Sequence, residues 1–459
     1  MEEKQQFRKM TQTPVGKLIM TLSIPTIISM LVTSVYNMAD TFFVSKLGTS
    51  ASGAVGIVFS LMAIIQAIGF TFGMGSGSWI SRLLGAKEEE KSKEVAATAF
   101  YTTLLLGLIL TVVGEWKLDA LMRLLGASDT ILPYARDYAQ FILLAAPIMA
   151  ASFVLNNILR SEGHAKFAMV GITTGGVLNI LLDPLLIHGF SMGIRGAAVA
   201  TALSQLVSFL ILLSYFVLGK TTTGLSFRKI SKEPSTCLKI VKNGLPSFSR
   251  QGLASVASIL LNKQAVLYGD AAVAAMAIVT KIFMLLFSVM IGFGQGFQPV
   301  AGFNFGAGKG LRVRKAIRFT LAAGTVGMSV AGAFLFFAAP WLMGLFVSAD
   351  AAVMEIGIMA LRAQAVSMPL IPLGTVANMT YQSVGKSLGA TVMASMRQGI
   401  FFIPLIYALP AFFDVYGIVT AQAAADTLTS AACAPFLLHF YRGIREEDGN
   451  GKQKDLSFM

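Results

Sequence analysis

The chain has 459 residues, of which 55% are hydrophobic and 13% are charged, and its formal net charge is +13. Soluble domains carry about 25% charged residues, so this composition excludes an ordinary soluble protein and predicts one that crosses the membrane many times. Two cysteines, Cys237 and Cys433, are too few for a disulfide framework. The three histidines are scattered singly and form no metal-binding pattern.

Apolar segments long enough to cross the bilayer follow one another along the whole chain. A helix needs about 20 residues to do so, and the stretch from Ala96 to Gly114 contains no charged residue. The expected spans are residues 18–45, 53–81, 95–115, 133–159, 167–188, 194–218, 239–268, 272–301, 316–345, 352–381, 388–412 and 415–441. The sequence thus predicts an all-α integral membrane protein with twelve transmembrane helices.

The charged residues between these spans predict the orientation of the chain. When alternate loops are assigned to opposite sides, most basic residues fall on the side that holds both termini. The other side receives only Lys46, Lys117, Arg123, Arg136 and Arg195. Because basic loops stay in the cytoplasm, both termini are predicted to be cytoplasmic. The net charge then reflects topology, and nucleic-acid binding is not expected.

The first span carries Pro25 and, fifteen residues later, Asp40. That separation corresponds to about 22 Å along a helix, so a bend at Pro25 would move the end that carries the carboxylate. Two plainer interpretations stay open. One is that Pro25 only kinks the helix and has no further role. The other is that Asp40 is solvated at the outer interface, since Lys46 and Gly48 soon end the span.

The fifth span places polar groups in the middle of an apolar run, at Asn179 and Asp183. A carboxylate at bilayer depth costs roughly 2.5–3.5 kcal/mol, so such residues usually face a bundle interior or a wet path. A spacing of four puts both side chains on one helix face. Pro184 also removes the donor that the carbonyl of residue 180 would have used. This face is predicted to bind a small cation.

The two halves of the sequence repeat each other at an offset of 221 or 222 residues. Phe72-Gly73-Met74-Gly75 recurs as Phe293-Gly294-Gln295-Gly296, and Gly85-Ala86 recurs as Gly306-Ala307. The basic loop between Gly219 and Lys242 lies near the midpoint and separates the copies. An even number of spans per copy predicts a parallel repeat about an axis along the membrane normal. The expected divisions are an N-lobe (1–218), a linker (219–238), a C-lobe (239–441) and a cytoplasmic tail (442–459).

The second half does not repeat the carboxylates of the first. At the repeat offset, Asp40, Asn179 and Asp183 correspond to Leu261, Phe401 and Leu405. The second half instead carries a mainly basic set within or near its spans, and some members are expected to reach the headgroup layer. The expected cavity charges are Arg250, Lys281, Arg362 and Asp426, with Lys263 and Arg397 nearby.

Four stretches together resemble the multidrug and toxic compound extrusion (MATE) family, closest to its DinF-like prokaryotic branch. They are Asn37–Gly48, Arg160-Ser-Glu-Gly163, Leu178–Pro184 and Gly196–Gln205, and the resemblance extends over about residues 14 to 441. It implies a V-shaped pair of six-helix bundles. It also implies a cation site of Asp40, Asn179, Asp183 and Thr201, with Asn156, and a first span that bends at Pro25.

The resemblance further implies a secondary active transporter rather than an enzyme. Such a protein exports amphipathic organic compounds in exchange for protons or sodium, as a monomer in the inner membrane of a prokaryotic cell. Its partners are small-molecule cargo and lipid, and no cofactor other than the coupling ion is expected. No metal site is expected apart from sodium at Asp40, Asn179, Asp183 and Thr201, if sodium rather than the proton is the coupling ion.

This sequence departs from the family pattern in its seventh and eighth spans. Some family members carry a carboxylate in these spans, whereas this chain has Arg250 and Lys281 there. A basic wall repels cations, which weakens the inference that the cargo is cationic. A flippase for a lipid-linked precursor is the alternative, since arginines and lysines could hold a phosphate. An intramembrane aspartyl protease is less favoured, because its Gly-x-Gly-Asp motif is absent.

Overall fold

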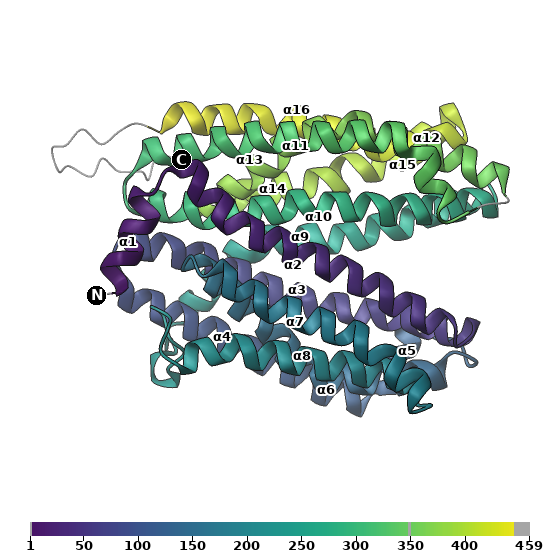
Figure 1. Cartoon of the computed structure of the whole chain (residues 1–459), viewed down its shortest axis with the longest axis horizontal. Helices are drawn as coiled ribbons and strands as arrows, with labels where there is room; N and C mark the ends of the chain where they lie inside the picture. Colours follow the sequence, from purple (N-terminus) through teal and green to yellow (C-terminus); the bar gives the residue numbers. More distant parts are fainter. Residues whose placement is uncertain (1, 348–349, 445–459) are drawn as a thin grey trace.

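A computed structural model describes residues 2–347 and 350–444, and within these ranges the chain is helical and contains no β-strand (Figure 1). The first part of the chain forms α1 (Glu2–Gln12), α2 (Val15–Ser45), α3 (Thr49–Gly85), α4 (Glu89–Trp116), α5 (Leu118–Leu124), α6 (Leu132–Ser161), α7 (Ala165–Pro184) and α8 (Ile194–Val217). A π-helical turn, η1 (Leu185–Gly189), follows α7 directly. A short 3-10 turn, η2 (Phe227–Lys229), lies between α8 and α9.

The second part of the chain contains interrupted helices as well as continuous ones. It forms α9 (Pro234–Val266), α10 (Asp270–Gly306), α11 (Gly310–Gly344), α12 (Ala351–Ser367), α13 (Ile371–Ser383), α14 (Ser387–Ser395), α15 (Phe402–Phe413) and α16 (Val415–Gly443). The 3-10 turn η3 (Met368–Leu370) joins α12 to α13, and the π-helical turn η4 (Met396–Phe401) joins α14 to α15. Each of these joined pairs is a single apolar span.

Within the described ranges, ten helical segments are long and apolar enough to cross a membrane. The long helices α9 and α16 bring the number to the predicted twelve. Their sequences are more polar, because α9 carries Arg250 and Lys263 and α16 carries Asp426. Some boundaries differ from the prediction: α9 begins at Pro234 rather than at residue 239, and α1 and α5 are short helices that were not expected.

The helices pack as two groups that follow the repeat. Most of the packing lies within the group α2–α8 and within the group α9–α16, and we call these groups the N-lobe and the C-lobe. Figure 1 shows them as two layers, one coloured from purple to teal and the other from green to yellow. Between the lobes, α2 packs on α10 and α3 packs on α9, which are equivalent pairs under the repeat. The repeat in the sequence is therefore also a repeat in space.

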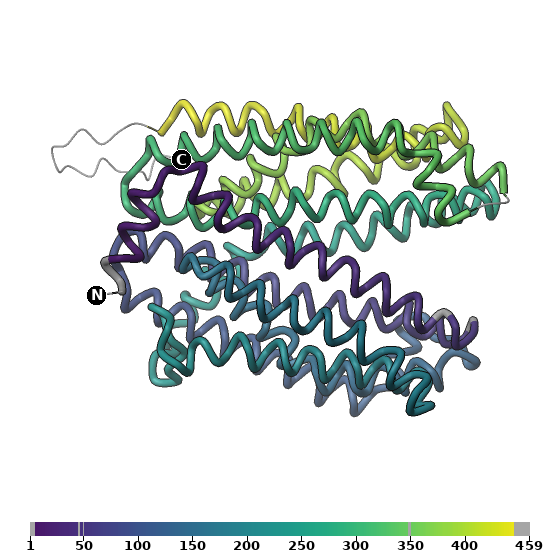
Figure 2. Tube along the Cα trace, in the orientation of Figure 1, coloured from purple at the N-terminus to yellow at the C-terminus, as the bar shows by residue number. Residues whose placement is uncertain are grey.

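The two ends of the bundle differ in how closely the lobes approach. We call the end that holds α1, the α3–α4 and α10–α11 turns and the end of α16 the basal end, and the opposite end the distal end (Figure 2). Most of the described hydrogen bonds between the lobes lie in the basal half, and the rest lie near the middle of the helices. Ser23 donates to the carbonyl of Phe293 (3.0 Å), and Arg82 donates to that of Ser383 (2.8 Å). The most distal ones described join Ser34 to Ser288 (2.9 Å) and Gln66 to Gln251 (3.5 Å).

The glycines of the repeated motif allow this close approach. A methyl group on Gly85 would lie 2.9 Å from the carbonyl carbon of Phe303, and one on Gly306 would lie 2.8 Å from that of Arg82. The pair is reciprocal, because α3 and α10 each present a glycine to the backbone of the other. Gly75 and Gly296 repeat the arrangement against α9 and α2. Small residues at helix crossings are a common device in membranes, and here they close the basal end.

Candidate functional site

The N-lobe brings together four of the five residues expected to form a cation site. Asp40 lies near the end of α2, Asn179 and Asp183 lie on α7, and Thr201 lies on α8. Their exposed fractions are 4%, 2%, 0% and 4%. Asp40 is therefore buried in the lobe rather than solvated at an interface.

Hydrogen bonds connect these side chains only loosely. The amide nitrogen of Asn179 donates to Asp183 Oδ1 (3.4 Å) and to Thr201 Oγ1 (3.3 Å). The hydroxyl of Tyr138, on α6, donates to Asp40 Oδ2 (3.4 Å). All three distances exceed the usual 2.7–3.2 Å. The donors that the lobe supplies therefore form only weak hydrogen bonds to the oxygens of the site.

Three buried oxygens of the site have no hydrogen-bond partner in the described chain. They are Asp40 Oδ1, Asn179 Oδ1 and Asp183 Oδ2. The two carboxylates also lie close enough to interact electrostatically. Leaving such groups unpaired away from water is costly, and no described ion pair compensates either charge. Carboxylate, amide and hydroxyl oxygens suit a hard cation, so the arrangement can hold protons on the carboxylates or a sodium ion between them.

Local features of α7 aim its polar face at α2. Asn179 and Asp183 lie one turn apart, and Pro184 together with η1 ends the regular α-helical pattern just beyond them. Such π-helical turns are frequent at functional sites. On the same helix, a methyl group at Gly176 would lie 2.6 Å from a methyl of Val32 on α2. Glycine at that position lets α2 approach α7, which brings Asp40 toward Asp183.

The site includes a residue that sequence analysis missed. Tyr138 is fully buried and contacts Asp40 by the hydrogen bond above. A tyrosine in a membrane span is most often an interfacial anchor, so the sequence offered no signal for this role.

Asn156 is not brought together with the other four residues. Its amide donates to the carbonyl of Ala168 (3.2 Å), which lies in the first turn of α7, toward the basal end. Asn179 is eleven residues further along that helix, a rise of about 16 Å. Asn156 instead ties α6 to α7, a role that a single polar residue in a span cannot reveal from sequence.

Pro25 lies in the basal half of α2, where that helix packs on the C-lobe. It is buried, and the residues around it hold α2 in place. Ser29 donates to the carbonyl of Pro25 (3.0 Å), and a methyl on Gly292 of α10 would lie 2.7 Å from Cα of Ile27. The proline thus lies at a contact between lobes, with Asp40 on the distal part of the same helix.

The expected C-lobe charges separate into two environments. Asp426, whose side chain is 1% exposed, accepts from Arg397 (2.6 Å). Arg250 lies on α9, close enough to Arg397 for repulsion between the two charges. Lys281 is exposed on α10, and Arg362 is exposed on α12, where it stacks on Phe336 of α11. Arg362 therefore lies on the outer part of the C-lobe, away from Arg250.

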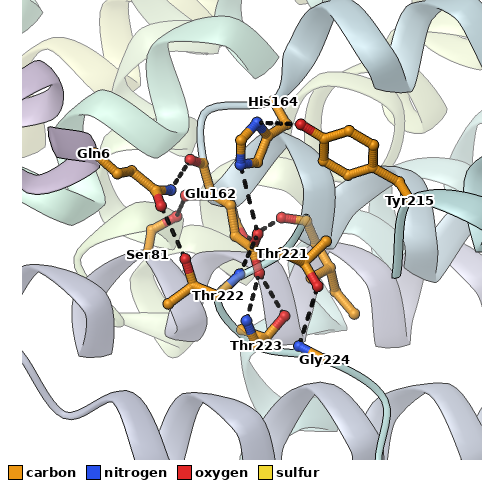
Figure 3. A network of polar contacts seen from close by, with 11 residues as sticks. Gln6, Ser81, Glu162, His164, Tyr215, Thr221, Thr222, Thr223 and Gly224 are labelled. Carbon is orange, nitrogen blue, oxygen red and sulfur yellow. Dashed lines mark hydrogen bonds and ion pairs between the residues drawn. The ribbon is translucent and has the colours of Figure 1, made fainter. Parts of the chain in front are cut away.

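A buried carboxylate outside the spans ties the basal end together (Figure 3). Glu162 follows α6 and accepts hydrogen bonds from the backbone of Thr222 (3.1 Å) and Thr223 (3.0 Å) in the linker. Its own carbonyl accepts from Gln6 of α1. Burial raises the pKa of Glu162 to about 7, although the threonine hydrogen bonds oppose that shift. One residue thus connects α1, the α6–α7 turn and the linker.

In the described residues, twelve spans form two repeated lobes, and one lobe buries carboxylates that have no ion-pair partner; these features define a polytopic membrane transporter. The MatE family model matches residues 25–185 and again 246–408. The chain is 30% identical to "Multidrug export protein MepA" of Staphylococcus saprophyticus over 92% of this chain and 93% of that protein. The protein of the same name from Staphylococcus aureus is also 30% identical, with the same coverage.

A solved structure agrees with the fold as a whole. It is described as the "Outward-facing conformation of a multidrug resistance MATE family transporter of the MOP superfamily". It superposes with a TM-score of 0.90 at 28% identity, over 96% of this chain and 98% of that one. The chain belongs to the MATE family. The predicted all-α fold of twelve spans and the family resemblance are thereby confirmed.

Proposed function

We propose that this transporter exports amphipathic organic compounds and exchanges them for protons or sodium ions that bind at Asp40 and Asp183. The observation that carries the proposal is the set of three buried, unpartnered oxygens on Asp40, Asn179 and Asp183. A site that lacks its positive partner binds a cation most strongly when it is closed off from water. The names of the relatives support export of drugs as the transported function.

The coupling follows from the charge of the site. Two neighbouring carboxylates in a low-dielectric lobe resist being ionised together. Entry of a cation from the distal end neutralises them and changes the relative stability of conformations open at either end. A ligand shifts such an equilibrium only by its different affinity for the two states, so cargo must bind less tightly once the cation is bound. Cargo then leaves through the distal end.

The proposal also fixes the orientation of the molecule. The basal end, with both termini, faces the cytoplasm of a prokaryotic cell, and the distal end faces outward. The basic residues of the linker and of the α10–α11 turn support this assignment. The protein works as a monomer in this proposal, because each chain contains both lobes. Bending of α2 near Pro25 moves Asp40 relative to α7, which links cation binding to the contact between lobes.

Transport by purified protein in liposomes tests this function. Efflux of a fluorescent amphipathic dye is measured under an imposed pH gradient and, separately, under an imposed sodium gradient. We expect one of the two gradients to drive efflux, and we expect Asp40→Asn and Asp183→Asn to abolish the gradient-driven part while dye binding persists. Asp426→Asn, in the other lobe, should impair gradient-driven efflux less than Asp183→Asn does. A double variant of Asp40 and Asp183 that still concentrates dye against its gradient would refute the coupling site.

A further inference from the structure

The C-lobe contains a polar cluster on helices equivalent to those of the N-lobe site. Asp426 Oδ1 accepts from Arg397 Nε (2.6 Å) and from Gln422 Nε2 (2.9 Å), and Oδ2 accepts from an Arg397 terminal nitrogen (3.3 Å). Both carboxylate oxygens are therefore occupied. Arg397 and Asp426 form a neutral pair, so Asp426 offers no uncompensated charge to another cation.

Arg250 is the charge that this pair leaves uncompensated. It lies on α9 and is only partly exposed, and in the described parts of the chain no hydrogen bond or ion pair includes it. The neighbouring charge on the facing turn η4 is Arg397, which has the same sign and repels it. An arginine held inside a membrane bundle without a partner is costly. It marks a place where a negative group would be stabilised.

The repeat shows that these side chains occupy the interior face of the lobe. At the repeat offset, Arg250 corresponds to Ser29, which lies on the same face of α2 as Asp40, since eleven residues are close to three full turns. Arg397 corresponds to Gly175, one turn before Asn179. In the last span, where Gly196 corresponds to Gly417, Asp426 corresponds to Gln205, one turn after Thr201. The C-lobe cluster is thus the counterpart of the N-lobe site, with the opposite excess charge.

An aromatic surface borders the cluster. The Phe283 and Phe287 rings on α10 are stacked, with centroids 5.9 Å apart and planes 13° from parallel. The guanidinium of Arg397 lies over Phe287, 4.0 Å from its centroid. Arginine beside an aromatic face provides stacking as well as charge. Next along α9, Gln251 reaches Gln66 of the N-lobe, so this turn of α9 lies where the lobes meet.

We propose that Arg250, supported by Arg397 and Phe287, binds the anionic group of an aromatic cargo molecule, so that this transporter takes zwitterionic or acidic aromatic amphipaths. The proposal rests on the export function above and specifies its cargo. Arg250 contacts the carboxylate or sulfonate, the ring system stacks beside Phe287, and Asp426 holds Arg397 in place. Because the N-lobe attracts the coupling cation and the C-lobe attracts an anion, the two ligands do not compete for the same charges.

Two dyes that differ by one charge test this assignment. We would measure, by fluorescence polarisation with the full-length protein in detergent, the binding of a rhodamine that carries a free benzoate and of the methyl ester of the same dye. We expect the free acid to bind at least tenfold more tightly than the ester. Arg250→Gln should remove this preference while leaving ester binding within about twofold, and Arg250→Lys should retain part of it.

The outcomes separate this proposal from the export function. Equal or weaker binding of the free acid by the unmodified protein, a preference unchanged in Arg250→Gln, or no binding of either dye would overturn it. The assay uses no gradient, so failure of coupled efflux would leave its result unaffected. If Arg250→Gln does not purify as a monodisperse protein, Arg250→Lys and Phe287→Leu decide the question. Phe287→Leu should weaken both dyes alike, because it removes the stacking surface and keeps the charge.

Discussion

Closure of the basal end depends on glycines, and replacing Gly306 by alanine measures that dependence. The added methyl would lie 2.8 Å from the carbonyl carbon and 2.9 Å from Cα of Arg82, both backbone atoms of α3. Carbon atoms prefer separations of about 3.5–4.0 Å, so α3 and α10 would have to move apart by about 1 Å. Overpacking of this kind costs about 1–3 kcal/mol.

That cost falls only on the conformation in which the basal end is closed. The equilibrium between conformations should therefore shift toward basal opening by roughly 5- to 150-fold. Ser78, which is 8% exposed and lies between the lobes near Gly302, reports the shift. In a protein with Cys237 and Cys433 replaced by serine, Ser78→Cys should react faster with a charged maleimide when Gly306→Ala is also present.

Gly327→Ala is the matched control, because no atom lies within 4 Å of the position its methyl would occupy. It should leave both the labelling rate and efflux close to those of the parent protein. Equal labelling of the Gly306→Ala and Gly327→Ala proteins would refute the reasoning, since it would mean that the contact between α3 and α10 does not hold the basal end closed.

Three further predictions concern the hinge, the basal carboxylate and the orientation. Pro25→Ala should slow efflux about tenfold, because it restores a backbone hydrogen bond that stiffens α2. Cation affinity, measured by titration of the same protein, should not change. An efflux rate equal to that of the parent protein would contradict this prediction. The pKa of Glu162 is raised to about 7, so the folded protein holds this proton more tightly than the unfolded chain does. The resulting contribution to stability is fully present below the ordinary pKa of a glutamate and is lost as pH rises through about 7. The melting temperature should thus fall by about 2 °C more between about pH 5 and about pH 8 in the parent than in Glu162→Gln, and identical pH profiles would argue against the assignment. A membrane-impermeant thiol reagent applied to whole cells should label Lys46→Cys and spare Ser226→Cys, and the reverse pattern would show that the orientation is inverted.

Much of the architecture could be predicted from the sequence because the membrane imposes simple rules. Length and apolarity predict spans, and the repeat at 221 or 222 residues predicts two equivalent lobes. The repeated glycines, including Gly85 and Gly306, are visible as a motif, and the structure shows that they form the contact between lobes. The cost of a carboxylate in a span similarly directs attention to Asp40 and Asp183.

What could not be predicted depends on partners far away in the chain. Asn156 and Asn179 look alike in sequence, yet one donates to a backbone carbonyl and the other faces two side chains of a site. Arg362 and Arg250 are both arginines about ten residues or more into apolar segments. Only the neighbouring helices decide that Arg362 stacks on the surface beside Phe336 while Arg250 approaches Arg397. The amphipathic helix α1 was missed because its contacts to Glu162 and to α10 come from distant segments.

The reciprocal glycine contacts have the geometry of a homodimer interface. In a twofold dimer, each subunit offers the same patch to the other, and here α3 meets α10 as α10 meets α3. Two identical half-length chains could form this basal contact, but both lobes would then necessarily have the same polar residues. Joining the copies through the linker frees each to change alone. The fused chain can keep Asp40 in one lobe and place Arg250 on the equivalent face of the other, an asymmetry that no homodimer of half-chains could encode.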